Sequence, residues 1–407
     1  MENLRIEKSS LDQIKKISKD REIVLFGAGG IASKTYDLLK NFKISCILDY
    51  SENLWETKEL NLKIKKPSEL LKKNKNKFFI IITTTSYRQV IEQLKKFNLT
   101  YNKDVLISPI LNDILIMNEL ESLEKEIIFS SGTPPNYNQK FGGGIYKVEI
   151  DRDRWTYEKK IDGHSFGLIE FEGNYVCVDN HIGIFEFNKN FKILRKKKLP
   201  AGIRGHGISY SKKYKRFFVP CSYLDSILVL NKDFKIVDEI KFSLKTKKSE
   251  GPAYHHLNDC LTINDSLYVS MFSITGNYKL DVYDGGVVEI DITSKKRIGT
   301  MISNLWMPHN IQLIDNSIHV LDSFPGYLRT NNNQIIGEFN AFTRGLDFDG
   351  KFYYVGQSKN RNHSKTLGTS NNISIDCGIS VFDKQTKVSR FIQFSPKISE
   401  IHSVKTI

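Results

Sequence analysis

Histidines gather at equivalent places in the second part of this 407-residue chain. Six short apolar segments can be aligned there as strands, and each opens on a residue that could do chemistry or support it. The opening positions are Phe166, His206, Asn258, His309, Arg344 and His402. Side chains alternate along a strand, so the residues two positions earlier face the same way. Those residues are His164, Arg204, His256, Met307, Phe342 and Glu400.

The alignment predicts two rings of side chains around one axis. Six of the nine histidines fall in or beside these rings, at positions 164, 206, 255, 256, 309 and 402. A ring of polar groups can simply hydrate a channel, and a lone histidine is usually structural. The clustering of so many at equivalent positions favours a functional site instead.

Imidazole, carboxylate and guanidinium groups in one place could transfer protons or bind an anion. The expected catalytic residues are His206, His309, His402 and Glu400. The expected substrate-binding residues are Arg204, Arg344 and His164. A metal is the other possibility, and imidazoles with one carboxylate suit Zn, Fe or Mn better than Ca. The expected metal ligands are His256, Asn258, His206, His309 and His402.

The elements that must position these residues form a repeat. From about Glu126 onward, short β-branched and aromatic strands recur in groups of four, which is typical of β-propeller blades. Five groups are complete. Residues 127–161 supply three strands that lack a first one, and the chain ends on "EIHSVKTI", a first strand that lacks the other three. We therefore expect a six-bladed propeller over residues 127–407 with velcro closure, in which the C-terminal strand completes the blade begun at 127–161.

Three long loops join second to third strands, which places them on the face where the first strands open. They read "SSGTPPNYNQKFGGG", "FSITGNYKLDVYDGG" and "QSKNRNHSKTLGTSNNISIDCG". Insertions that gather on one face of a repeat fold usually mark the binding face.

The first 115 residues have a different pattern, in which buried strands alternate with amphipathic helices. This predicts an α/β domain with a parallel, Rossmann-like sheet, followed by a helical linker over 116–126. The turn Gly27-Ala28-Gly29-Gly30-Ile31-Ala32 fits the dinucleotide fingerprint, and Asp49 follows at the end of the next strand. The expected cofactor-binding residues are Gly27, Gly29, Gly30 and Asp49, for NAD(P) or another nucleotide.

Two resemblances add to this reading. The segment from "IVLFGAGGIASKTYDLLKNF" to "FFIIITTTSYRQVIEQL" resembles the small Rossmann-like domain of bacterial polysaccharide and sugar-nucleotide biosynthesis proteins. The segment "HHLNDCLTINDSLYVSMF" resembles six-bladed propellers of the gluconolactonase, regucalcin and strictosidine-synthase-like superfamily. There an Asn-Asp pair serves a divalent metal site, which would carry over to Asn258 and Asp259. The chain also looks like an uncharacterised family of bacterial propellers.

Composition and charge limit the partners and the cellular location that we expect. The net charge of +14 invites a nucleic-acid partner, but the lysine runs "KKNKNK" and "RKKKLP" sit at element ends, where a solvated face is the simpler interpretation. The first twenty residues are charged and polar, so we expect no signal peptide, and no apolar run is long enough to span a bilayer. The five cysteines are scattered. We expect a cytoplasmic protein without a nucleic-acid partner or membrane insertion; the oligomeric state is left open.

Three functions compete. The first is an enzyme of surface-glycan or sugar-nucleotide metabolism, of hydrolase, lyase or epimerase type, whose partner is an anionic sugar or sugar nucleotide. The second is a non-catalytic propeller that binds a glycan or protein, joined to a nucleotide-sensing domain. The third is an NAD-linked oxidoreductase.

Overall fold

The computed structural model describes residues 6–133, 142–243, 253–359 and 374–407. The chain divides into two compact units, Met1–Glu119 and Leu120–Ile407. Within the described ranges, no helix is long and apolar enough to cross a membrane.

The first unit is an α/β domain around a six-stranded sheet of order β3-β4-β2-β1-β5-β6. Its strands are β1 (Glu22–Phe26), β2 (Ile44–Leu48), β3 (Lys58–Glu59), β4 (Leu62–Lys65), β5 (Phe78–Ile82) and β6 (Val105–Ile107). All neighbours run parallel except β3 and β4, which form an antiparallel pair. The helices are α1 (Leu11–Ser18), α2 (Gly30–Leu38), α3 (Pro67–Asn74), α4 (Tyr87–Lys95) and α5 (Asn112–Glu121).

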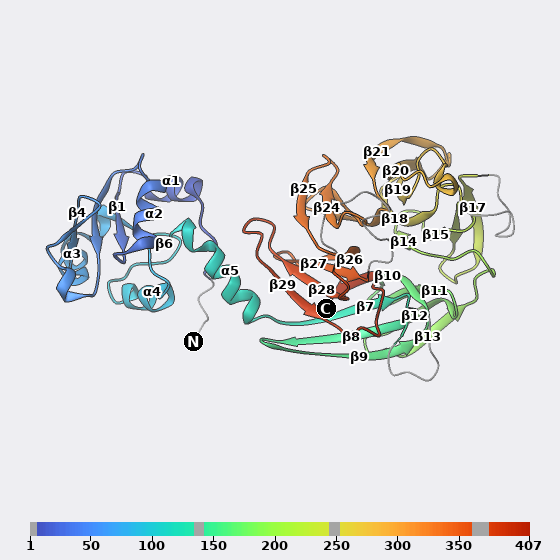
Figure 1. Cartoon of the computed structure of the whole chain (residues 1–407), viewed down its shortest axis with the longest axis horizontal. Helices are drawn as coiled ribbons and strands as arrows, with labels where there is room; N and C mark the ends of the chain where they lie inside the picture. Colours follow the sequence, from blue (N-terminus) through green and yellow to red (C-terminus); the bar gives the residue numbers. More distant parts are fainter. Residues whose placement is uncertain (1–5, 134–141, 244–252, 360–373) are drawn as a thin grey trace. The chain divides into compact units, whose positions relative to one another are not determined.

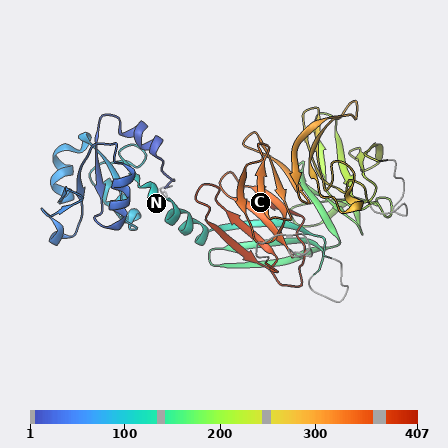
Figure 2. The ribbon, with the colours of Figure 1, turned by 45° about the horizontal axis from the view of Figure 1, so that its top comes forward.

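The residue pattern explains the layers of this unit. Every residue of β5 is buried, as expected for a central parallel strand covered on both faces. Helix α4 buries Tyr87, Val90, Ile91 and Leu94, which recur at the spacing of one helical face. Helices lie on both sides of the sheet (Figure 2). The expected parallel α/β domain is therefore present in its coarse features.

The second unit is a six-bladed β-propeller, which confirms the fold predicted for this part of the chain. Five four-stranded sheets follow one another around a ring (Figure 1). The first three are β10 (Ser165–Phe171) to β13 (Ile193–Lys197), β14 (Ser209–Ser211) to β17 (Ile236–Lys241), and β18 (Leu257–Ile263) to β21 (Arg297–Leu305). The next two are β22 (His309–Ile314) to β25 (Ile335–Glu338) and β26 (Phe342–Phe348) to β29 (Ser389–Gln393).

The strands between these limits complete the five blades. They are β11 (Asn174–Asp179), β12 (Gly183–Phe187), β15 (Arg216–Cys221), β16 (Ser226–Leu230), β19 (Ser266–Met271), β20 (Gly285–Asp291), β23 (Ser317–Asp322), β24 (Tyr327–Thr330), β27 (Tyr353–Ser358) and β28 (Gly378–Phe382). Strand β24 is the segment "YLRT", the least regular third strand of the repeat.

The sixth sheet joins the two ends of the unit, with order β30-β7-β8-β9. Its strands are β7 (Glu124–Ser131), β8 (Gly144–Asp151), β9 (Arg154–Asp162) and β30 (Ser403–Thr406). The C-terminal strand pairs antiparallel with β7, with Ser403 opposite Ser130 and Thr406 opposite Ile127. The red C-terminal strand and the green β7 therefore belong to one blade (Figure 1).

One first strand is shorter than its sequence suggests. The pattern "RGHGISYS" indicates a strand from residue 204, yet β14 begins at Ser209. His206 donates its backbone N–H to the carbonyl of Pro220, but Pro220 has no N–H to return. The hydrogen-bond ladder between the first and second strands is interrupted there, and the backbone around His206 is not a regular strand.

Candidate functional site

A repeated irregularity interrupts the first strands of four blades. In four blades the pairing of first and second strands shifts register just after the strand begins. The shifted residues include Phe166, Asn258, Asn310 and Arg344. A β-bulge of this kind bends the strand and re-aims a side chain, and such bulges are common beside active sites.

Two residues before the aligned opening positions of three blades, the backbone is left-handed. Arg204, His256 and Met307 have φ values of 50°, 54° and 56°. They occupy equivalent positions in consecutive blades. Non-glycine residues in this region are held there by their surroundings, and they concentrate at functional sites.

Buried aspartates hold these segments in place. Asp179 accepts hydrogen bonds from the backbone N–H groups of His164 and His181, and Asp322 accepts from Trp306 N. Asp225 accepts from the backbone N–H groups of Tyr254, His255 and His256. Asp179 also accepts from the hydroxyl of Ser165, and Asp322 pairs with Arg329. Each carboxylate thus helps to fix the backbone of a loop.

Three of the predicted histidines meet at the axis. The ring centroids of His206 and His402 are 5.0 Å apart, and those of His206 and His309 are 5.5 Å apart. Phe166 contacts two of them, with centroids 5.0 Å from His206 and 4.3 Å from His402. All three histidines are buried. Four different blades thus supply one cluster.

Arg344 ties this cluster together. Its Nε donates to Nε2 of His309 at 3.2 Å, and its Nη1 donates to Oε2 of Glu400 at 3.2 Å. The same carboxylate oxygen accepts from Nε2 of His402 at 2.9 Å. Arg344 and Glu400 are both at least nine-tenths buried, so their opposite charges compensate each other.

The histidines of the cluster are held in their neutral form. Burial, followed by the charge of Arg344, lowers the pKa of His402 to about 3, although Glu400 opposes this. Burial and neighbouring positive groups also put the pKa of His206 and His309 well below the usual range. Burial lowers the pKa of His256 to about 3. Neutral imidazoles can accept protons from a bound substrate.

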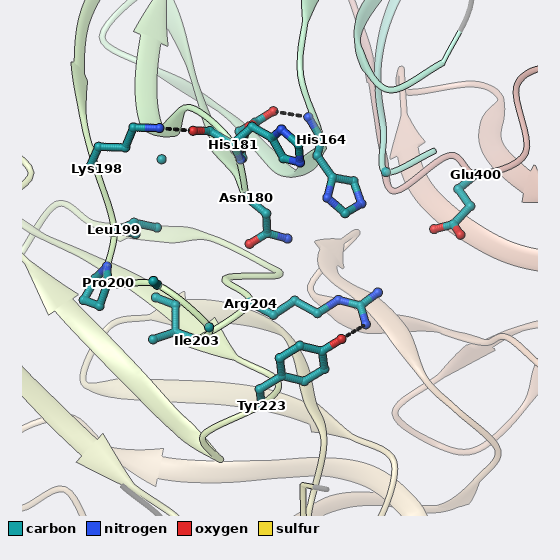
Figure 3. Close-up of a pocket in the computed structure, with 15 residues that line it drawn as sticks. His164, Asn180, His181, Lys198, Leu199, Pro200, Ile203, Arg204, Tyr223 and Glu400 are labelled. Atoms are coloured by element: carbon teal, nitrogen blue, oxygen red, sulfur yellow. Dashed lines mark hydrogen bonds between the residues drawn. The ribbon is translucent and has the colours of Figure 1, made fainter. Parts of the chain in front are cut away.

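Two cavities open beside the cluster and share Arg204. The larger, of about 450 Å³, is lined by residues that include His164, His181, Lys198 and Glu400. Figure 3 shows the side chains of His164, Arg204 and Glu400 directed into it. The smaller, of about 210 Å³, is lined by residues that include His206, His256, Tyr278, His309, Arg344 and Lys359.

Arg204 is the cation best placed to meet a ligand. Its Nη1 donates to the hydroxyl of Tyr223 at 3.0 Å, and its guanidinium lies over the rings of Phe166 and Tyr223. Within the described ranges no carboxylate pairs with it. Lys198 also lines the larger cavity and bonds the carbonyl of His181. Two cations and two carboxylates line the larger cavity, whereas Arg204, Arg344 and Lys359 line the smaller one without a lining carboxylate. The smaller cavity therefore carries the positive charge that suits an anionic ligand.

The family of the chain can now be given. The model of the "Domain of unknown function (DUF4915)" matches residues 193–407, slightly more than half of the sequence. The chain belongs to the DUF4915 family. The DUF4915 region contains every residue of the histidine and arginine cluster except Phe166. No curated protein matches the chain in sequence.

Several solved structures are similar to parts of the chain. A nidogen/laminin complex matches with 11% identity and a TM-score of 0.47, covering 70% of this chain and 98% of that one. A protein of unknown function from Bacteroides caccae matches with 13% identity and a TM-score of 0.47, covering 70% and 99%. Virginiamycin B lyase from Staphylococcus aureus matches with 16% identity and a TM-score of 0.36, covering 53% and 74%. These distant similarities say nothing about activity.

Two of the predicted metal ligands, His309 and Asn258, are bonded to protein groups, whereas Oδ1 of Asn258 and Nδ1 of His402 are buried without a partner in the described part of the chain. Nδ1 of His309 contacts the carbonyl of Met307 at 2.9 Å while Nε2 accepts from Arg344. Asn258 is fully buried and donates towards the carbonyls of His256 and Pro308. Among the described residues, no group of three or more His, Cys, Asp or Glu side chains is arranged to hold a metal. A guanidinium inside the cluster fits an anion better than a cation.

Sequence reasoning missed an aromatic group beside the smaller cavity. The ring of His256 lies parallel to that of Phe272, at 4.4 Å and 14°, and it also contacts Tyr278 at 4.7 Å. Tyr278 and Tyr283 come from the loop "FSITGNYKLDVYDGG", which was expected to lie on the binding face. The other two long loops lie largely outside the described residues. The available signal was the density of aromatic residues in this one loop.

A third cavity, of about 320 Å³, lies in the α/β unit and is lined by residues that include Gly27, Gly29, Gly30, Asp49 and Thr83. Gly27 has a φ of 110°, and a Cβ there would lie 3.0 Å from Cβ of Thr84. A Cβ on Gly29 or Gly30 would meet nothing within 4 Å. Asp49 accepts from the backbone N–H groups of Ala28 and Ser51, at 2.8 Å each.

Proposed function

We propose that the propeller is an acid–base enzyme that acts on an anionic, carbohydrate-like substrate. The observation that carries this proposal is the position of Arg204, a guanidinium without a carboxylate partner in the described residues, between two cavities and beside the neutral imidazole of His206. Arg204 would bind the acidic group of the substrate, and His206 would face the adjacent carbon. The substrate class is an acidic sugar such as a uronate.

The geometry favours proton transfer next to a carboxylate over glycoside hydrolysis. Hydrolysis of a glycosidic bond usually needs two carboxylates on opposite sides of it. Of the carboxylates lining the larger cavity, Asp179 is occupied by backbone N–H groups, which leaves Glu400. Loss of a proton from the carbon beside a carboxylate instead needs a neutral base and cations that stabilise the enolate.

Each group then has a role. His206 lines the smaller cavity, and within the described ranges no protein group bonds its ring nitrogens, so it would accept the proton. Arg204 would hold the carboxylate as negative charge moves onto it, with Arg344 adding positive charge nearby. A bound anion would also raise the pKa of His206 towards neutrality by offsetting the cations around it. An epimerase would deliver a proton to the opposite face of the same carbon from a second acid or water, and a lyase would expel the group on the next carbon.

The proposal is tested by measuring the exchange of a substrate proton for deuterium. The protein is incubated in D₂O with glucuronate, galacturonate and their oligomers, and NMR records exchange at the carbon beside the carboxylate. Binding is measured by calorimetry, with glucose as the uncharged control. Arg204→Ala should abolish binding, whereas His206→Asn should bind but exchange no deuterium. Binding without exchange by the wild type would favour a non-catalytic receptor, and failure of every uronate to bind would overturn the proposal.

We infer a nucleotide or dinucleotide as the ligand of the α/β unit. The cavity at the glycine turn supports this, since the space beside Gly29 and Gly30 would let phosphate approach the start of α2. Gly29 has a φ of 136°, so any side chain there strains the backbone. Gly30→Leu fills the space without that strain and is the cleaner test. Wild type should show a rise in melting temperature with NAD(H), ADP or UDP that Gly30→Leu lacks, and no rise with any of them would contradict the assignment.

A further inference from the structure

Four aromatic rings follow one another beside the smaller cavity, and we call them the aromatic platform: Tyr278, Tyr283, Trp306 and Phe324. The centroids of successive rings are 5.9, 6.2 and 5.6 Å apart. Trp306 is nearly parallel to both neighbours, at 27° to Tyr283 and 29° to Phe324. Tyr278 and Tyr283 line the cavity itself, so the platform continues directly from the proposed site.

The platform is partly open to solvent but its backbone is fixed. Trp306 is 37% exposed, so part of its ring is open to a ligand. Its backbone N–H donates to Asp322 and its carbonyl accepts from Phe324 N. Tyr278 N likewise donates to the carbonyl of Tyr254. Rings held in advance lose little freedom when a ligand binds.

The edges of these rings carry unused polar groups. Within the described part of the chain, no hydrogen-bond partner meets the hydroxyls of Tyr278 and Tyr283 or the indole N–H of Trp306. Buried or half-buried Tyr and Trp normally find such partners. Ring faces combined with hydrogen-bonding edges match a pyranose, which offers C–H groups on one face and hydroxyls around its rim.

We propose that the aromatic platform binds a second sugar ring, so that the natural substrate is an acidic oligosaccharide and not a free monosaccharide. This rests on the proposed function, because the acidic ring is placed at Arg204. The adjoining ring of the chain would then lie across Tyr283 and Trp306. Lys359 and Arg204 line the same cavity. The two cations would therefore lie beside the acidic sugar, and the aromatic side chains beside the next sugar of the chain.

The experiment compares galacturonic acid with its dimer and trimer by calorimetry. In the wild type the dimer should bind at least about tenfold more tightly than the monomer. Trp306→Ala should remove that gain and leave monomer affinity within about twofold, while Trp306→Phe, which keeps a flat ring, should retain part of it. Leu280→Ala is the control, because Leu280 belongs to the loop that carries Tyr278 and Tyr283 and is 65% exposed outside the platform.

The outcomes separate the two proposals. If no member of the series binds, the proposed function fails and this inference falls with it. If the monomer binds but the dimer binds no better, the platform is not a sugar subsite although the acidic site stands. If Trp306→Ala weakens monomer and dimer equally, its effect is on the fold or the first site, which also overturns the inference.

Discussion

Arg344 donates from Nε to Nε2 of His309 across 3.2 Å, and the opposite nitrogen of that imidazole contacts the carbonyl oxygen of Met307 at 2.9 Å. A carbonyl only accepts, so the proton must lie on Nδ1 and Nε2 must be the acceptor. His309 is therefore held as one neutral tautomer whose free lone pair points at Arg344. We therefore expect His309 to position Arg344; the sequence had suggested a base or a metal ligand.

A double-mutant cycle tests that relationship. His309→Phe keeps the ring but removes the acceptor, and Arg344→Ala removes the cation. Each should weaken uronate binding by about tenfold, and the double variant should lose little more than the larger single loss, since the two residues act as a unit. Calorimetry measures all four proteins, with His319→Gln as the histidine control outside the site. Additive losses would show that His309 acts independently of Arg344.

A second prediction concerns Gly132, which packs against His402. A Cβ at Gly132 would lie 2.5 Å from Nε2 of His402 and 2.7 Å from its Cδ2. The imidazole must then move and lose its bond to Glu400. We expect Gly132→Ala to lower the free energy of unfolding by about 1–3 kcal/mol, as overpacking does, and to reduce deuterium exchange. Denaturant unfolding measures the first effect.

Gly299→Ala is the matched control, because a Cβ there meets nothing within 4 Å. The clash also predicts non-additivity. Adding His402→Ala to Gly132→Ala removes the obstructing ring, so the pair should cost less than the sum of the two changes. A Gly132→Ala protein as stable and active as the wild type would show that the ring is not fixed there.

The repeat pattern was sufficient to predict the propeller and to bring His206, His309, His402 and Arg344 to one axis, because strand order and alternation follow from sequence spacing. The roles of the side chains were not predictable in the same way. Asn258 aligns with His309, yet its amide donates to two backbone carbonyls, whereas His309 also accepts from Arg344. Tautomers and the partners of buried carboxylates depend on contacts between blades that no local pattern records.

A third prediction follows from the neutral histidines. Burial lowers the pKa of His256 and His402 to about 3, and also puts those of His206 and His309 well below the usual range. In the unfolded chain histidine titrates near about 6.5, so the unfolded state binds more protons at mildly acid pH. The contribution of the neutral histidines to the free energy of unfolding is fully present above about pH 6.5 and is lost as the pH falls towards 3.

Two buried carboxylates act in the opposite direction. Burial raises the pKa of Asp259 and Asp322 to about 6, which favours the folded state as the pH falls. Four histidines outweigh two aspartates, so the melting temperature should fall between pH 7 and pH 5. Calorimetric scans measure this, and His256→Phe should make the decline smaller by removing one titrating group. A melting temperature that stays constant or rises towards pH 5 would contradict the assignment of neutral, buried histidines.

The last prediction concerns the closing strand, residues 400–407. Strand β30 pairs with β7, whose residues from Ile127 to Ser131 are all buried. Removing the last eight residues would leave the edge of β7 without its hydrogen bonds and would expose its apolar side chains. It would also remove Glu400, leaving Arg344 buried without the carboxylate that it contacts. We expect insoluble protein, or a broad transition at a much lower melting temperature.

Two controls separate ring closure from loss of the site. The double variant Glu400→Gln, His402→Phe keeps the strand while removing both functional side chains, so it should remain folded but inactive. Deleting Ile407 alone, which is 44% exposed, should change stability little. Circular dichroism and light scattering report folding and aggregation for each. If the eight-residue truncation stays soluble and unfolds cooperatively near the wild-type temperature, the C-terminal strand is an addition to the ring and does not hold it closed.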